Sequence, residues 1–316
     1  MRVLVIALLV MIAELQCSID QRARIFYINS YHNGYPPSDE IQSAIQASFS
    51  KDSFDLHIFH LDAKRDADSA ALARKASDAL AEYLAFDPDI VVTSDDAAIQ
   101  YFLEPFSPRI NVPAVYCGLN WSSAGYELKN ATGILEVLPL PEMLSHIRSE
   151  YPELNAITIL SEDSEAEQRN LLLLDTLFKN TGFTPSYSMV RDFHQWKAEL
   201  IRSDSISGLI YLPTNGAIKD WNDAEAINMI RHLRSPTVTC DAFMMRYCAL
   251  GFVKIASEQG IEASKIAKRI LNGESVHAIL EKRNVLFEVW VNDALVKKFD
   301  KLVPSSYEVR WMGTER

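Results

Sequence analysis

The chain has 316 residues, of which 48% are hydrophobic and 23% are charged, a composition typical of a soluble globular protein. Its 31 basic and 42 acidic residues give a net charge of −11, and no run of Lys or Arg interrupts the acidic balance. Nucleic acid is therefore not an expected partner, because proteins that bind it present basic surfaces to the phosphate backbone. Chains of this length usually divide into two domains, since single cores stop growing near about 250–300 residues.

The N-terminus has the pattern of a secretory signal peptide. An uninterrupted apolar run from Val3 to Ala13 is shorter than the roughly 20 residues that span a membrane, but it matches the hydrophobic region of an export signal. We therefore predict that residues 1–20 are a signal peptide and that the mature protein is periplasmic. Two alternatives stay open at this point: a lipid anchor at Cys17, which lacks the usual small residues before it, and a buried first strand.

Motifs of common enzymes and metal sites are missing from the sequence. No two of the eleven glycines are two residues apart, so neither GxGxxG nor GxSxG occurs. Cys117, Cys240 and Cys248 lie in apolar stretches and are expected in the core. Their odd number and the lack of a CxxC pair indicate neither a disulfide framework nor a metal site, and we expect no cofactor.

Strands and helices alternate along the chain, which predicts an α/β fold with parallel sheets in two Rossmann-like lobes. The first strand is expected at 24–30. Pro36 and Pro37 then open a helix whose residues Ile41, Ile45 and Phe49 share one face. Strands at 54–61, 89–94 and 112–118 and helices at 67–85 and 97–103 complete the first half.

The second half repeats this pattern. Its predicted strands are 156–160, 184–190, 208–212 and 237–240, and its helices are 164–179, 194–202 and 220–233. A strand at 133–138 runs into Pro139 and Pro141, which we interpret as breakers at the first crossing between the lobes. After 250 we expect a strand, a helix that ends at Asn272-Gly273, a strand at 285–292 and a short helix at 293–299.

The elements predicted after residue 250 must either belong to the first lobe or extend one of the sheets. We predict a first lobe of residues 24–134 plus about 251–283, and a second lobe of residues 135–250 plus about 284–316. The crossings near 132–139 and 250–253 would serve as hinges, because a few residues between rigid lobes absorb the change in backbone angles.

Four segments carry a resemblance to a known family: 25–35 (IFYINSYHNGY), 91–96 (VVTSDD), 112–120 (VPAVYCGLN) and 260–273 (GIEASKIAKRILNG). They resemble the substrate-binding proteins of ABC transporters, in the type I periplasmic-binding-protein superfamily, over roughly residues 25–299. Pro37 stands where that pattern usually has a bulky aromatic residue, so one wall of the pocket is expected to differ. The resemblance implies a hinged cleft for a small-molecule ligand, which includes aromatic amino acids.

The same resemblance implies a membrane partner. The permease of an ABC importer is the first expectation. A sensor kinase stays open as the alternative, because a branch of the superfamily serves in the sensory parts of signalling proteins.

Polar loops follow the carboxyl ends of six predicted strands, three in each half. Ligands of open α/β sheets bind outside these ends, where backbone N–H groups of the next helix converge. Helix capping is the alternative role for Ser94, Asp95 and Asp241, and the favoured one for Asp163 and Ser164. The candidate ligand-binding residues are Ser30, Tyr31, His32, Tyr35, Ser94, Asp95, Asp96, Asn120, Trp121, Ser161, Glu162, Thr214, Asn215, Asp241 and Phe243.

Aromatic rings beside carboxylates in these loops indicate a ligand with a ring and a cationic group, such as an amino acid or an amine. Asp95 and Asp241 follow strands of opposite halves, and we expect both to compensate the ligand's cation when the cleft closes. An enzyme is disfavoured, since Ser30 beside His32 is its only support and neighbouring loop residues seldom point at each other.

Overall fold

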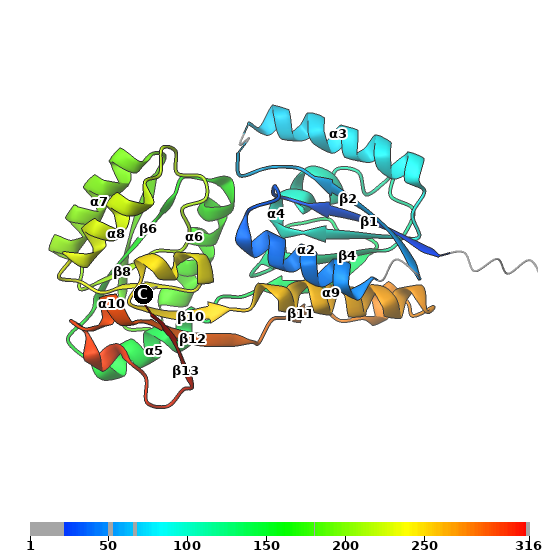
Figure 1. Ribbon diagram of the computed structural model, residues 1–316. Helices are drawn as coiled ribbons and strands as arrows, with labels where there is room; N and C mark the ends of the chain where they lie inside the picture. Colours follow the sequence, from blue (N-terminus) through cyan, green and yellow to red (C-terminus); the bar gives the residue numbers. More distant parts are fainter. Residues whose placement is uncertain (1–21, 50–52, 66–67, 180, 314–316) are drawn as a thin grey trace, which may run out of the picture.

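Two separate β-sheets, one in each of two lobes, organise the computed structural model of this chain (Figure 1). The structure describes residues 22–49, 53–65, 68–179 and 181–313, so the predicted signal peptide and Cys17 lie outside the described residues. Within these ranges no helix is long and apolar enough to cross a membrane. The arrangement confirms the α/β class with two lobes.

The sheet of the first lobe has six strands in the order β11-β5-β4-β3-β1-β2, all paired in parallel. Helices cover both faces, which is why the central strands are apolar on both sides. Helices α2 and α9 pack on one face and α3 and α4 on the other. The strands are β1 (Ala23–Asn29), β2 (Phe54–His60), β3 (Ile90–Ser94), β4 (Ala114–Asn120), β5 (Ala131–Glu136) and β11 (Lys282–Arg283).

Helices of the first lobe follow the predicted segments closely. They are α2 (Pro36–Ser48), α3 (Ser69–Phe86), α4 (Asp95–Ala98), the π-helical turn η1 (Ile99–Leu103), α9 (Ala256–Leu271) and the 3₁₀ turn η3 (Val276–Ala278). In α2, Ile41 and Ile45 are buried against the sheet, as their spacing predicts, and Phe49 is buried directly after the helix.

Helices α2 and α9 approach each other closely at one glycine. A Cβ atom on Gly260 of α9 would lie 2.4 Å from the carbonyl oxygen of Ile41 in α2. Only a residue without a side chain fits at this distance. The chain re-enters the first lobe at the start of α9, so this contact fixes the position of α9 against α2.

The sheet of the second lobe has seven strands in the order β13-β12-β10-β9-β8-β6-β7. One pair, β10 and β12, is antiparallel. The reason is topological: β10 runs toward the first lobe, whereas β12 carries the chain back from it. The strands are β6 (Ala156–Glu162), β7 (Thr184–Val190), β8 (Leu209–Tyr211), β9 (Thr237–Thr239), β10 (Leu250–Lys254), β12 (Phe287–Asn292) and β13 (Val309–Met312).

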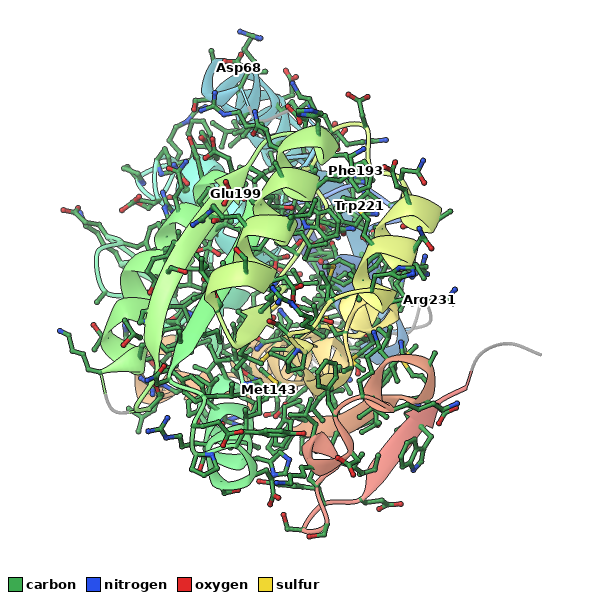
Figure 2. All side chains as sticks on the ribbon, turned by 90° about the vertical axis from the view of Figure 1, so that its left-hand side faces the viewer. Asp68, Met143, Phe193, Glu199, Trp221 and Arg231 are labelled. Atoms are coloured by element: carbon green, nitrogen blue, oxygen red, sulfur yellow. The ribbon has the colours of Figure 1, made fainter. Side chains whose placement is uncertain are left out.

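Helices around the second sheet share one core, which includes the three rings of Phe193, Trp196 and Trp221. The Phe193 and Trp221 rings, whose residues are labelled in Figure 2, lie 5.1 Å apart edge to face. The helices are α5 (Leu140–Glu150), α6 (Glu165–Phe178), α7 (Phe193–Ile206), α8 (Asp223–Arg231), α10 (Asp293–Val296) and the 3₁₀ turns η2 (Ala242–Tyr247) and η4 (Asp300–Leu302). Cys240 and Cys248 are buried in this lobe and Cys117 in the other, which confirms their predicted place in the core.

The chain crosses between the lobes three times, and two sequence-based boundaries need correction. Residues 250–253, expected at a crossing and partly in the first lobe, belong to β10, which pairs with β9 and β12 in the second sheet. That crossing falls at Ile255 instead. Leu135 and Glu136, expected in the second lobe, end β5 of the first sheet. The third crossing lies between β11 and β12.

Helix α5 was not predicted, because Pro139 and Pro141 were interpreted as helix breakers. Pro141 instead occupies the first turn, where the missing N–H removes no helical hydrogen bond. Four buried apolar residues of α5 join the core of the second lobe: Leu140, Met143, Leu144 and Ile147.

We expect Gly260→Ala to lower the free energy of unfolding by about 1–3 kcal/mol, because the added methyl group forces α9 away from the α2 backbone. Chemical denaturation measures this loss. Ile261→Ala, at the next and exposed position of α9, is the control, with a change within about 0.5 kcal/mol. Equal effects of the two changes would contradict the close packing of the helices.

Candidate ligand-binding cleft

Carboxyl ends of strands from both sheets face one cavity between the lobes, which we call the polar cavity. It holds about 60 Å³, enough for a few water molecules at roughly 10–15 Å³ each, and polar atoms form more than half of its wall. Its lining residues are Tyr31, Tyr35, Pro37, Lys64, Asp95, Asn120, Glu136, Leu138, Ala166, Glu167, Asn170, Tyr211, Pro213, Thr214, Asp241 and Lys254.

A buried ion pair joins the two lobes at this cavity. Lys64 follows β2 of the first lobe, and its ammonium group contacts the carboxylate of Glu162 at the end of β6. Both side chains are almost fully buried. The Lys64 Nζ atom also lies 5.3 Å from the ring centroids of both Tyr31 and Tyr35, within cation–π distance.

Glu162 also accepts hydrogen bonds from residues of its own lobe. Its Oε2 atom accepts hydrogen bonds from the Ala217 N–H at 2.7 Å and from Thr214 Oγ1 at 3.4 Å. Burial alone would raise the pKa of Glu162, but the Lys64 ammonium and the Ala217 N–H hold it below the usual value. The carboxylate therefore stays ionised, and the pair links the two lobes directly.

A second buried lysine, Lys254, lies beside the crossing between the lobes at Ile255. Lys254 ends β10 and contacts the carboxylates of Glu136, at the end of β5, and of Asp241, at 3.2 Å. Burial raises the pKa of Glu136, although Lys254 opposes this shift. Lys254 is thus shared between Asp241 and Glu136, and the hypothesis that Asp241 also compensates a ligand's cation stays a prediction.

Asp95 is different, because its buried Oδ2 atom has no hydrogen-bond partner among the residues that the structure describes. The residue adopts a φ of +66°, a conformation that costs a non-glycine residue roughly 1–3 kcal/mol. Gly118 makes room for it, since a Cβ there would lie 3.0 Å from Asp95 Oδ1. Burial, and then the charges of Glu136 and Asp96, raise the pKa of Asp95 well above its usual value.

Two residues of the second lobe that line the polar cavity, Asn170 and Tyr211, also carry buried polar atoms. Asn170 Oδ1 is buried without a hydrogen-bond partner among the described residues, whereas the Tyr211 hydroxyl has the Cys240 thiol beside it. The amide group of Asn170 donates at its other end to Glu167 at 2.9 Å, which fixes its orientation. Buried polar atoms are nearly always paired, so the unpaired atoms of Asn170 and Asp95 make the polar cavity the candidate ligand site.

Six of the fifteen candidate residues line the polar cavity: Tyr31, Tyr35, Asp95, Asn120, Thr214 and Asp241. Four others support its wall. Asp96 accepts a hydrogen bond from Asn120 Nδ2, Ser161 donates to Glu167 at 2.7 Å, and Glu162 pairs with Lys64. Phe243 packs against Tyr35, with ring centroids 5.8 Å apart.

The other five candidates do not line the polar cavity. Ser30 donates to the Ser94 carbonyl oxygen at 2.6 Å and accepts from the Ala98 N–H at 2.7 Å. The Ser94 hydroxyl bonds the Tyr27 hydroxyl at 2.8 Å. His32 faces Asp62 at 3.3 Å. The remaining two also lie elsewhere: Trp121 packs against the core of the second lobe, and Asn215 stands in the loop beside Thr214.

Helix capping accounts for only some of the polar residues in these loops. Ser164 caps α6 by accepting a hydrogen bond from the Glu167 N–H, as expected. Asp163 instead pairs with Arg191. No side-chain cap is formed by Ser94 or Asp241.

Sequence reasoning missed several cavity residues: Lys64, Glu136, Glu167, Asn170 and Lys254. Three of them stand at or just after the carboxyl end of a strand, the same signal that found the others, but the loops after β2, β5 and β10 were not considered. Glu167 and Asn170 lie in the first two turns of α6, and no pattern in the sequence marks them.

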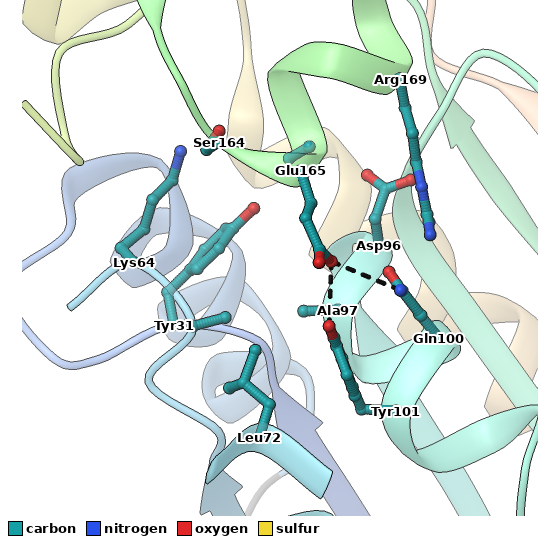
Figure 3. A pocket seen from close by; sticks show the side chains of 12 residues that line it. Tyr31, Lys64, Leu72, Asp96, Ala97, Gln100, Tyr101, Ser164, Glu165 and Arg169 are labelled. Atoms are coloured by element: carbon teal, nitrogen blue, oxygen red, sulfur yellow. Dashed lines mark hydrogen bonds between the residues drawn. The ribbon is translucent and has the colours of Figure 1, made fainter. Parts of the chain in front are cut away.

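We call the second cavity between the lobes the side chamber (Figure 3). It holds about 50 Å³ and lies between α3, α4 and the start of α6. Glu165 of α6 accepts hydrogen bonds across it from Tyr101 at 2.9 Å and Gln100 at 3.4 Å. Ser69 donates a third hydrogen bond to Glu165, at 3.2 Å. These three donors belong to the first lobe, so their hydrogen bonds to Glu165 also join the two lobes.

We expect Lys64→Met to open the cleft of the ligand-free protein, because Glu162 would lose the buried cation that compensates it, a loss typically worth about 3–5 kcal/mol. Small-angle scattering should show a larger radius of gyration. Arg65→Met is the control, since Arg65 forms an exposed pair with Asp62 worth about 0–1 kcal/mol. Unchanged dimensions in Lys64→Met would contradict the role of the pair.

We expect Asp95→Asn to stabilise the ligand-free protein more at pH 8 than at pH 5. The Asp95 carboxyl has a raised pKa in the folded state, so the protein loses stability as the pH rises from the ordinary pKa of the group to the raised one. Asn does not titrate, so the variant lacks this loss. Melting curves at both pH values measure the difference. Asp163→Asn is the control: because Arg191 and Gln168 lower the pKa of Asp163, its carboxylate is ionised at both pH values, and the change should destabilise the protein equally at pH 5 and pH 8. A destabilised Asp95→Asn protein at pH 8 would contradict this description.

No protein-family model and no curated protein sequence matches the chain. Solved structures do match its fold. An ABC domain from Streptococcus pneumoniae in complex with L-Trp has a TM-score of 0.70 and 15% identity, over 90% of this chain and 97% of that one.

Two further structures are similar. A substrate-binding protein with adhesive properties from Clostridium difficile, described as ligand-free and open, has a TM-score of 0.69 and 13% identity, over 93% of this chain and 100% of that one. An ABC transporter solute-binding protein from Bacillus halodurans with bound myo-inositol has a TM-score of 0.59 and 13% identity, over 90% and 99%. The chain therefore has the type I periplasmic-binding-protein fold that these solute-binding proteins share.

Proposed function

We propose that this chain is an extracytoplasmic solute-binding protein that closes on a small zwitterionic amino acid and delivers it to the permease of an ABC importer. The fold, the two-lobe cleft and the signal peptide expected at residues 1–20 support this proposal. The similar structures are named as proteins that bind solutes, and one of them is in complex with L-Trp.

The observation that carries the proposal is Asp95, which lines the polar cavity and whose buried Oδ2 atom has no hydrogen-bond partner in the described part of the chain. An ammonium group is its natural partner, because a charge-assisted hydrogen bond to a cation favours the ionised carboxylate. Asn170 Oδ1 adds a second acceptor from the opposite lobe. A ligand that contacts both atoms would hold the lobes together.

Lys64 supplies the complementary charge. An ammonium group carries three donors, and Glu162 is the partner that the structure gives to Lys64 Nζ. Lys64 also lines the polar cavity, so its remaining donors are available to a ligand carboxylate. Asp95 and Lys64 together present one acceptor and one donor of opposite charge, which match the two ends of an amino acid.

Catalysis is not supported by the one sequence feature that suggested it. Ser30 Oγ is bonded to the backbone of Ser94 and Ala98, while His32 faces Asp62. No hydrogen bond links Ser30 to His32 among the described residues, so the hydroxyl has no base to activate it. We therefore infer that the ligand is bound and released without chemical change.

A thermal-shift and calorimetric panel tests the function, with glycine, L-alanine, L-phenylalanine and L-tryptophan against the neutral myo-inositol. We expect an amino acid to bind and to be recovered unchanged. Asp95→Asn should weaken its binding at least tenfold, which needs only about 1.4 kcal/mol. Asp89→Asn, outside the cleft, is the matched control. Binding of myo-inositol alone, or full affinity in Asp95→Asn, would contradict the proposal.

A further inference from the structure

One face of α6 holds the second lobe against the first beside the side chamber. Glu165 reaches from α6 to Gln100 and Tyr101 of the first lobe and accepts a hydrogen bond from each (Figure 3). One helical turn later, Arg169 donates a hydrogen bond to the Tyr126 hydroxyl, and its guanidinium group lies 5.7 Å from the centre of that ring. Side chains four residues apart share one face of a helix, so this face of α6 is turned toward the first lobe.

We call these contacts the α6 latch. The residues of the latch are Glu165 and Arg169 of α6 and Ser69, Gln100, Tyr101 and Tyr126 of the first lobe. The partners in the first lobe belong to three separate segments, namely the start of α3, the turn η1 and the loop between β4 and β5. The hydrogen bonds of Glu165 are exposed to solvent, in contrast to the buried ion pair of Lys64 and Glu162. Water can therefore replace them when the lobes move apart.

The latched cleft has little room for a solute. The polar cavity holds about 60 Å³ and the side chamber about 50 Å³. Sites that enclose a small organic ligand usually hold about 300–1,000 Å³. A solute of the size of L-phenylalanine therefore cannot enter the cleft while the latch is formed, and the lobes must first move apart.

We propose that the α6 latch is an autoinhibitory contact, which keeps the empty cleft closed so that a solute binds only after the latch has opened. This inference rests on the proposed function for the identity of the solute. When only part of a protein is in the state that binds, the apparent affinity falls by that fraction, so the latch weakens binding. The polar cavity is lined by other residues, so changes in the latch leave the contacts proposed for the ligand's charged groups intact.

Small-angle scattering tests the latch without any ligand. Glu165→Ala removes three hydrogen bonds between the lobes, and we expect a larger radius of gyration of the ligand-free protein. Gln168→Ala is the matched control, because Gln168 lies in the same part of α6 but donates its hydrogen bond to Asp163 of its own lobe, at 2.7 Å. Unchanged dimensions in Glu165→Ala, or the same increase in both variants, would overturn the latch.

Tyr101→Phe shows whether the effect comes from the latch or from a weakened start of α6. The hydroxyl group of Tyr101 reaches the second lobe through Glu165. Its loss should therefore widen the cleft of the unmodified protein and of Gln168→Ala but add nothing in Glu165→Ala. Fully additive effects of the two changes would contradict the latch, and melting curves check that each variant folds.

Calorimetry with L-phenylalanine determines the direction of the effect on binding. Because more of the protein is open before the ligand arrives, we expect Glu165→Ala to bind about threefold more tightly or better. Gln168→Ala should keep the affinity of the unmodified protein. A latch that also forms around the bound ligand predicts the reverse, so weaker binding by Glu165→Ala would overturn the autoinhibitory role.

A covalent bridge between the lobes is the strictest test. Ser69 and Glu165 are hydrogen-bonded at 3.2 Å, so a short bifunctional thiol reagent can join cysteines at these positions, while the described native cysteines are buried. The double variant Ser69→Cys/Glu165→Cys should bind L-phenylalanine before bridging and at least tenfold more weakly afterwards. Full affinity after bridging would overturn autoinhibition. If no amino acid binds any form, the proposed function fails, and the scattering of the ligand-free variants still decides the latch.

Discussion

The closed cleft depends on two opposite charges that are buried where the lobes meet. Lys64 and Glu162 come from different sheets, and taking both out of water costs several kcal/mol per ion before their attraction repays it. The main effect of the pair is therefore on the relative position of the two lobes and not on the free energy of unfolding. It determines which groups face one another across the cleft, and it places Asp95 of one lobe in the same cavity as Asn170 of the other.

The two parts of the cleft differ in how their polar groups are satisfied. In the polar cavity, buried acceptor atoms of Asp95 and Asn170 have no partner, although unpaired buried groups are costly. In the side chamber, the carboxylate of Glu165 is fully engaged by donors from the first lobe. A ligand therefore gains hydrogen bonds in the polar cavity, whereas opening the cleft to admit it breaks those of Glu165.

Much of the fold could be predicted from the sequence, because the apolar strands and the amphipathic helices α2 and α9 carry clear periodicity. Helix α5 was missed since a proline in a first turn looks like a breaker when the start of the helix is unknown. The β10 crossing was misplaced because strand pairing is a long-range property: only the register of Leu250 against Val291 shows which sheet holds the strand.

The site was harder to predict than the fold. The rule on strand ends leads to Asp95 and Thr214, and it would also have led to Lys64 had the loop after β2 been included. The rule on strand ends cannot predict which charged side chains form ion pairs with each other. That Lys254 compensates Asp241 while Asp95 has no cation in contact follows from side-chain positions in three dimensions, which residue type and spacing do not encode.

Proton release on binding tests the central claim, that a ligand's ammonium group takes Asp95 as its partner. Burial favours the protonated carboxyl in the empty cleft, and a bound cation favours the ionised one, so binding must expel a proton at pH values between the two pKa values. Calorimetric titration with L-phenylalanine, in buffers of different ionisation enthalpy between about pH 5 and pH 8, measures that release. We predict an affinity that rises with pH and a proton release that disappears in Asp95→Asn. A pH-independent affinity without proton release in the unmodified protein would contradict the account.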